Sequence, residues 1–153
     1  MLRRSRGLLW LAGLALTLAG CGASVNQPVP AACLGTPQDV TGALVGAPGH
    51  VALTEGTQLS RCVARATSDG DLQNLGTVLS GAADALAARM PHDSRAALRL
   101  GFLIGAVRRG AMHTQGVSAE LVRRLEQSGR MDAPPPSVEA ALRRGLSAGQ
   151  DHG

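Results

Sequence analysis

The sequence predicts an all-α fold, a small bundle of four to five helices that follows a flexible tether and an irregular segment. From residue 57 onward, apolar residues recur with the 3.6-residue period of amphipathic helices, whereas glycine and proline interrupt the stretch before it. The chain has 153 residues, of which 44% are hydrophobic and 17% charged. This length and composition suffice for one domain with a hydrophobic core.

The N-terminal segment predicts export. Arg3, Arg4 and Arg6 form a positively charged start and precede an apolar stretch of eleven residues, 8–18. A membrane-spanning helix needs about 20 apolar residues, so this stretch is too short to span a bilayer but has the length of a secretory signal. We therefore expect residues 1–20 to be a signal peptide.

The signal ends in Leu18-Ala19-Gly20-Cys21, which resembles the lipobox of bacterial lipoproteins. This resemblance implies that the chain is cut immediately before Cys21 and that acyl chains on the Cys21 thiol attach it to a membrane. It also implies a location in the cell envelope, on the extracytoplasmic side of that membrane. The alternative is an ordinary secretory signal that contains a cysteine.

The next two segments lack helical periodicity. Residues 21–32 are small, uncharged and interrupted by proline, which predicts a lipidated cysteine followed by a flexible tether. Residues 33–56 are expected to be irregular. Within them, residues 43–45 and 51–53 flank the turn signal Pro48-Gly49, so a short hairpin is one alternative and a loop lying over the bundle is the other.

Three cysteines are an odd number for an exported chain. With Cys21 assigned to lipid, Cys33 and Cys62 remain, and we expect them to form a disulfide in an oxidising compartment. The alternative is a redox-active or metal-binding thiol. No Cys-x-x-Cys motif is present, and neither cysteine has a histidine within ten residues, so the disulfide is favoured.

Residues 57–153 are expected to form the helical domain. The first helix places Cys62 on its inward stripe, with Thr57 as its N-cap, and the second begins at the cap Asp71 and stops at Pro91. Helical spacing of apolar residues defines both stripes: Leu59, Cys62, Val63 and Ala66 for the first, and Leu72, Leu75, Leu79, Ala82, Leu86 and Met90 for the second.

A third helix is expected to start near Asp93 and Ser94 and to contain the apolar run 100–107, which predicts the buried centre of the domain. Gly101 and Gly105 share one face of it, so a neighbouring helix should approach closely there. A fourth helix, ended by Gly129, is predicted from the apolar stripe Val117, Leu121, Val122 and Leu125. A fifth helix, capped by Ser137, is predicted from the stripe Val138, Ala141, Leu142, Gly145 and Leu146.

Composition excludes several kinds of chemistry. All 15 basic residues are arginine, so no P-loop lysine or Schiff-base lysine exists. One Phe, one Trp and no Tyr leave no stacking platform for bases, so we expect no nucleic-acid binding. Met90-Pro91-His92 and Met112-His113 are soft metal ligands, but the third helix separates them by about 30 Å. We expect no metal, no cofactor and no catalytic residues.

Three Arg-Arg pairs lie in the C-terminal half of the chain. The formal net charge is +4, but the predicted signal holds three arginines and no acid, so the mature chain would carry only +1. Residues 95–153 nevertheless hold nine arginines against five acids. The three pairs are Arg108 and Arg109, Arg123 and Arg124, and Arg143 and Arg144. One alternative is that they contact anionic lipid headgroups of the membrane, and the other is that they are ordinary solvated surface.

These patterns predict a lipid-anchored, extracytoplasmic helical protein that acts as a non-catalytic binding or interaction module of the cell envelope. Its partner would be an envelope protein, the membrane surface or an apolar ligand. The alternative is an accessory subunit or an enzyme of envelope metabolism whose site forms only on folding. Asp, His and Arg converging in one deep cleft would favour the enzyme, and an exposed Leu/Val stripe would favour partner binding.

Overall fold

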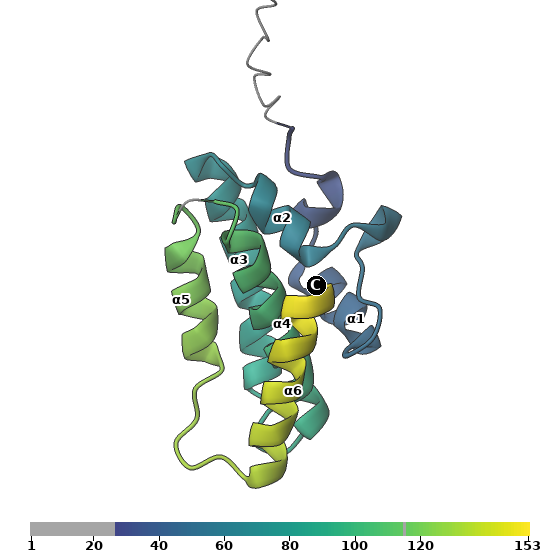
Figure 1. Ribbon diagram of the computed structural model, residues 1–153, viewed down its shortest axis with the longest axis vertical. Helices are drawn as coiled ribbons and strands as arrows, with labels where there is room; N and C mark the ends of the chain where they lie inside the picture. The colour runs from purple at the N-terminus through teal and green to yellow at the C-terminus, as the bar shows by residue number, and fades with distance from the viewer. Residues whose placement is uncertain (1–26, 115) are drawn as a thin grey trace, which may run out of the picture.

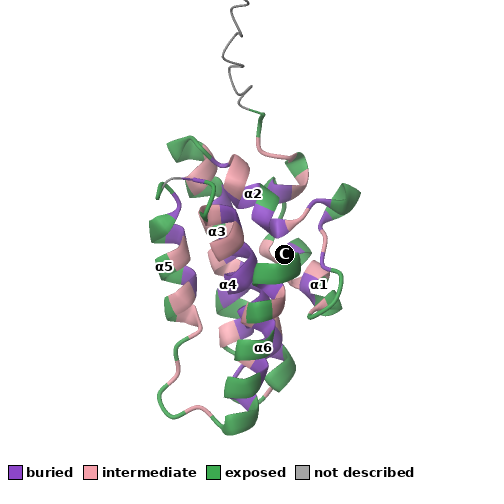
Figure 2. Ribbon diagram, viewed as in Figure 1, coloured by how far each residue is buried: buried purple, intermediate pink, exposed green. Residues whose placement is uncertain are grey.

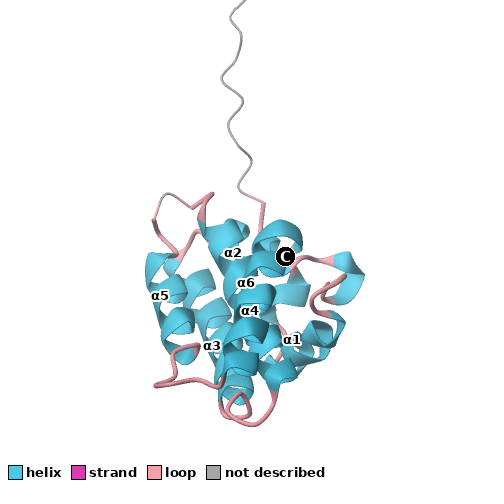
Figure 3. Ribbon diagram, turned by 60° about the horizontal axis from the view of Figure 1, so that its bottom comes forward, coloured by secondary structure: helices cyan, strands magenta, loops and turns pink. Residues whose placement is uncertain are grey.

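The computed structural model describes residues 27–114 and 116–153 of the chain. Figure 1 traces the chain through these elements, and Figure 3 shows that within the described ranges they are helices joined by loops, without strands. This confirms the all-α prediction. The elements are η1 (Ala31–Leu34), α1 (Pro37–Ala43), η2 (Leu44–Gly46), η3 (Thr54–Gly56), α2 (Leu59–Arg65), α3 (Asp69–Ala87), α4 (Ser94–Ala111), α5 (Ala119–Ser128) and α6 (Pro136–His152), where η denotes a 3₁₀-helix.

The segment 33–56 is more helical than the sequence predicted, and the alternative of a hairpin is wrong. Helix α1 begins at a capping box in which the Thr36 hydroxyl accepts from the Asp39 backbone N–H at 3.3 Å. The Asp39 carboxylate accepts in return from the Thr36 N–H at 2.7 Å. This reciprocal cap, with Pro37 in the first turn, starts a helix over only seven residues and buries Val40 in the core.

Two predicted helix starts are corrected by the structure. Ser68, not Asp71, caps α3, because the Ser68 hydroxyl accepts from the Asp71 N–H at 3.1 Å. Asp71 instead lies in the first turn of α3, where its negative charge interacts favourably with the partial positive charge of the helix N-terminus. Helix α6 begins at Pro136, one residue before the predicted cap Ser137, because proline is pre-organised for the first helical position.

Three other helix boundaries were also predicted from the sequence. Asp93 caps α4 by accepting from the Arg95 N–H at 2.9 Å, and Gly129 follows the last residue of α5, so both predictions are confirmed. Thr57 does not cap α2, because Gln58 takes the cap position. Thr57 is buried in the preceding turn, where its carbonyl accepts from the Leu53 N–H at 2.8 Å.

The predicted disulfide joins Cys33 of η1 to Cys62 of α2, with a Cα–Cα distance of 5.5 Å. Both side chains are buried. The loop it closes spans 29 residues, for which the loss of unfolded-chain entropy corresponds to about 3–4 kcal/mol of stabilisation. The disulfide fixes the N-terminal part of the described chain to α2, so residue 27 emerges at the end of the molecule that carries α2 (Figure 1).

Helix α4 is the centre of the bundle. Figure 2 shows it buried along most of its length, and α2, α3, α5 and α6 all pack against it. Phe102, Leu100 and Leu103 are completely buried within it. The apolar run 100–107 thus lies inside the domain, as predicted.

The closest helix contact joins α4 to α6, which run parallel to each other. Gly101 and Gly105 of α4 face Gly145 and Gly149 of α6 across this contact. A Cβ at Gly101 would overlap the backbone carbonyl oxygen of Leu142 in α6, and one at Gly105 would overlap that of Leu146. In the other direction, a Cβ at Gly145 would overlap the carbonyl oxygen of Leu98 in α4, and one at Gly149 that of Phe102. The two backbones therefore meet without intervening side chains, which confirms the expected close approach at Gly101 and Gly105.

We expect Gly105→Ala to destabilise the domain, because the new methyl group must push α6 away from α4. Overpacking of this kind costs about 1–3 kcal/mol, which would lower Tm by several degrees in a thermal melt followed by circular dichroism. Gly76→Ala is the matched control, since Gly76 lies inside α3 with nothing near its absent Cβ. It should stabilise the domain by about 0.5–1 kcal/mol through helix propensity. Equal shifts in both variants would contradict the close α4–α6 contact.

Candidate functional site

The first Arg-Arg pair, Arg108 and Arg109, lies at the end of α4 and makes contacts within the fold. The Arg108 Nε donates to the Glu126 carboxylate of α5 at 2.8 Å. Arg109 donates to the backbone carbonyl of Gln150 at 2.9 Å and also to that of Asp151. These carbonyls belong to the last turn of α6, which has no further helical N–H groups to bind them. Arg108 therefore joins α4 to α5, and Arg109 caps α6.

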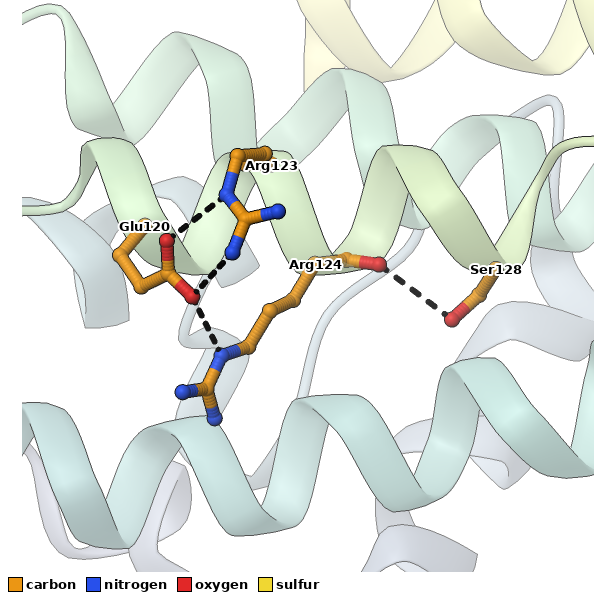
Figure 4. A network of polar contacts seen from close by, with 4 residues as sticks. All are labelled: Glu120, Arg123, Arg124 and Ser128. Carbon is orange, nitrogen blue, oxygen red and sulfur yellow. Dashed lines mark hydrogen bonds and ion pairs between the residues drawn. The ribbon is translucent and has the colours of Figure 1, made fainter.

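The second pair, Arg123 and Arg124, is shared by a single acid on the same helix. Glu120 accepts from the Nε of each arginine at 2.8 Å, as Figure 4 shows. Hydrogen bonds from Arg123, and then from Arg124, lower the pKa of Glu120 to about 2, and the carboxylate in turn raises the pKa of Arg123. All three side chains are largely exposed, so this network contributes modestly to stability.

The two arginines of the third pair, Arg143 and Arg144, lie on different surfaces of the domain. Arg143 donates to Glu139 one helical turn earlier at 3.0 Å. The Arg144 side chain makes no hydrogen bond or ion pair with any described residue. Because adjacent helical residues point about 100° apart, Arg143 faces α5 while Arg144 faces the segment after α1. The six predicted arginines therefore do not form one basic face.

A cleft lies between α5 and α6. Both helices pack against α4 but hardly touch each other, and Figure 1 shows α5 set apart from α6, with parts of α3 and α4 visible between them. The cleft consists of two adjoining hollows of about 550 and 230 Å³ that share Gly129, Arg130 and Leu142. We call these two hollows the α5–α6 cleft. Its other apolar lining residues are Met90, Met131, Pro134 and Val138 in the larger hollow, and Gly101, Ile104 and Leu146 in the smaller.

Charged side chains surround this apolar lining. The ion pair between Arg108 and Glu126 lines the smaller hollow, and Arg143 stands on the opposite wall. The larger hollow contains two acids, Asp132 and Glu139, both exposed to solvent. No histidine lines either hollow. The lining of the cleft thus combines apolar side chains with a smaller number of charged ones, a composition typical of binding sites for small molecules.

The large exposed apolar side chains of the described residues do not form a continuous stripe. Leu34 and Val45 belong to η1 and η2, while Met112 and Val117 lie in the connection between α4 and α5. Isolated side chains of this kind are normal on protein surfaces. These residues therefore do not form the exposed Leu/Val stripe that would favour partner binding.

Two arginines that the sequence reasoning did not single out share a hollow with Arg144. Arg95 and Arg99 are one turn apart on α4 and line, with Arg144, a surface hollow of about 360 Å³. A sequence signal for them exists. Neither has an acid three or four residues away on its helix, whereas Arg123, Arg124 and Arg143 each do.

Cys21 and the predicted signal peptide lie outside the described residues. Among the residues that are described, no helix is long and apolar enough to cross a bilayer. Within the same ranges, no three His, Cys, Asp or Glu side chains gather in a way that would bind a metal ion. Met90 and Met112 flank opposite ends of α4, as the helix geometry predicted.

We expect the Glu120 carboxyl to titrate near its folded value of about 2, well below the ordinary 4.5, because two arginines stabilise the charged form. Since the folded pKa is the lower one, this stabilisation is complete above pH 4.5 and is lost as the pH falls toward 2. Carboxyl-detected NMR measures this pKa, and replacing both Arg123 and Arg124 by Gln should return it toward 4.5. Arg143→Gln on α6 is the control and should not move it. A wild-type pKa near 4.5 would show that these pairs are open in solution.

Comparisons with known proteins give no match: no protein-family model, no curated protein and no solved structure matches the chain.

Proposed function

We propose that this chain is a lipid-anchored protein on the extracytoplasmic side of a bacterial membrane, and that it is a non-catalytic binding module. Its ligand is a small molecule with a substantial apolar part, which it binds in the α5–α6 cleft. The anchor is the acylated Cys21. The α5–α6 cleft is the observation that carries the binding role.

The size and lining of the cleft support a small-molecule ligand. The larger hollow, at about 550 Å³, lies within the range of roughly 300–1,000 Å³ that is typical of such sites. Met90 and Met131 contribute to its lining, and methionine side chains adapt readily to the shape of an apolar ligand. Both acids of the larger hollow, Asp132 and Glu139, are exposed to solvent, and Glu139 is paired with Arg143.

The position of the cleft is compatible with attachment through the N-terminus. Residue 27 emerges at the α2 end of the molecule, while the loop between α5 and α6 lies at the opposite end (Figure 1). Gly129, Met131 and Pro134, which line the larger hollow, belong to that loop or its start. A domain held by its N-terminal tether therefore leaves the larger hollow open to the surrounding solution.

The anchor rests on the lipobox-like Leu18-Ala19-Gly20-Cys21, and the Cys33–Cys62 disulfide is in keeping with export. Metabolic labelling with a fatty-acid analogue in a bacterial host should mark the wild-type chain and not Cys21→Ala. The wild type should remain with the membrane fraction, because two acyl chains give stable attachment. Cys33→Ala is the control, since it removes a cysteine that the disulfide uses, and it should stay labelled. Labelled Cys21→Ala would rule out this anchor.

The cleft is tested with the fluorescent apolar probe N-phenyl-1-naphthylamine. It is added to a chain that begins at Gln27, after its helical circular dichroism and cooperative melting have been verified. Leu142→Gln places an amide in both hollows and should weaken probe binding about tenfold, the effect of losing about 1.4 kcal/mol of apolar contact.

Leu34→Gln is the matched control, because Leu34 is 47% exposed on η1 and does not line the cleft. It should leave the probe affinity unchanged. If the wild-type chain does not bind the probe, or if both variants weaken it equally, the cleft is not the binding site.

A further inference from the structure

A separate hollow, on the other side of α6 from the α5–α6 cleft, carries a concentration of unneutralised positive charge. It lies between α4, α6 and the segment that follows α1, and its volume is about 360 Å³. We call it the basic hollow. Its lining consists of Arg95, Leu98 and Arg99 from α4, Arg144 from α6, and the short apolar segment Val45, Ala47 and Pro48.

No carboxylate lines the basic hollow. None of its three guanidinium groups makes a hydrogen bond or ion pair with another residue in the described ranges. The nearest acid along the chain, Asp93, does not line the hollow and accepts from the Arg95 backbone N–H as the cap of α4. By contrast, Arg143, the immediate neighbour of Arg144, binds Glu139.

Like charges one helical turn apart destabilise a helix, so Arg95 and Arg99 repel each other. Arg144 brings a third positive charge to the same hollow from another helix. An anion bound among them would relieve this repulsion. Guanidinium groups present several N–H donors in a planar fork that matches the oxygens of a phosphate group, and three of them together suit its charge of about −2.

The remaining lining of the basic hollow is apolar. Val45 is 61% exposed, although a valine gains from being removed from water, and Pro48 is exposed beside it. Leu98 forms the buried floor. An inorganic anion would contact only the arginines, whereas an anion that carries an apolar group would also cover Val45 and Pro48.

The geometry points to a binding site for a phosphate monoester with an apolar substituent, whose phosphate binds Arg95, Arg99 and Arg144 and whose substituent covers Val45. This chemistry occurs both in soluble alkyl phosphates and in phosphatidate headgroups of a membrane. The site is separate from the α5–α6 cleft, and it does not depend on the proposed ligand of that cleft.

The test uses the full chain, labelled with ¹⁵N-arginine and purified in a non-ionic detergent, at constant ionic strength. Butyl phosphate is the soluble probe, and the Nε–Hε signals of the arginines report binding. The signals of Arg95, Arg99 and Arg144 should shift together with one dissociation constant. Arg144→Gln should weaken binding about tenfold, which corresponds to about 1.4 kcal/mol.

Arg143→Gln is the matched control, since it removes the adjacent guanidinium and the same charge, and it should leave the affinity unchanged. Val45→Ser should reduce the preference for butyl phosphate over inorganic phosphate without changing the affinity for inorganic phosphate. Shifts spread evenly over all arginines, equal weakening by both Gln variants, or equal affinity for the two phosphates would each overturn the proposal.

A second arm identifies the source of the phosphate. The full chain is placed in phosphatidylcholine nanodiscs with or without phosphatidate, and no soluble phosphate is added. Shifts of the same three signals that require phosphatidate, and that Arg144→Gln abolishes, support a lipid ligand. Binding of butyl phosphate without any effect of phosphatidate supports a soluble ligand, and absence of specific binding in both arms overturns the site.

Discussion

The glycine contact between α4 and α6 determines where the C-terminal helix lies against the buried centre of the bundle. Because Gly101 and Gly105 meet Gly145 and Gly149 at backbone distance, the two helices are fixed in register as well as in separation. This register brings the last turn of α6 against the end of α4 and the start of α2. There the carbonyls of Gln150 and His152 accept hydrogen bonds from Arg109 and Gln58, and a backbone oxygen of Gly153, just after the helix, accepts one from the Ser60 hydroxyl. The same end of the bundle contains the Cys33–Cys62 disulfide.

The parallel direction of α4 and α6 also explains the α5–α6 cleft. A chain that leaves the end of α4 must return along the bundle before it can start α6, and α5 is this return segment. Since α6 is held against α4 by backbone contact, α5 packs against α3 and α4 instead and leaves a cleft beside α6. Arg143 turns toward this cleft and Arg144 away from it, so one Arg-Arg pair contributes to two different surfaces.

The features that follow from local sequence were predictable, and those that depend on distant contacts were not. Apolar periodicity identified the five segments from α2 to α6, and cysteine counting identified the disulfide. Helix α1 was missed because it buries one residue, Val40, and so shows no apolar period, whereas the equally short α2 buries Leu59, Cys62 and Val63. The capping pattern Thr36-Pro37-Gln38-Asp39 nevertheless marks the start of α1. Within-helix partners such as Glu139 and Arg143 can be read from their spacing. The pairing of Arg108 with Glu126, and the capping of α6 by Arg109, require the tertiary fold.

The contacts of the individual arginines also show where the excess of positive charge in residues 95–153 lies on the structure. Arg108, Arg123, Arg124 and Arg143 bind acids of the same region, and Arg109 binds the carbonyl end of α6. Of the nine arginines in that region, this leaves Arg95, Arg99, Arg130 and Arg144 without such contacts among the described residues. Arg130 lines the α5–α6 cleft, and the other three line the basic hollow. A net charge of only +1 for the predicted mature chain therefore conceals a local positive field, because the neutralised arginines make contacts within the fold while the four unneutralised ones line the α5–α6 cleft and the basic hollow.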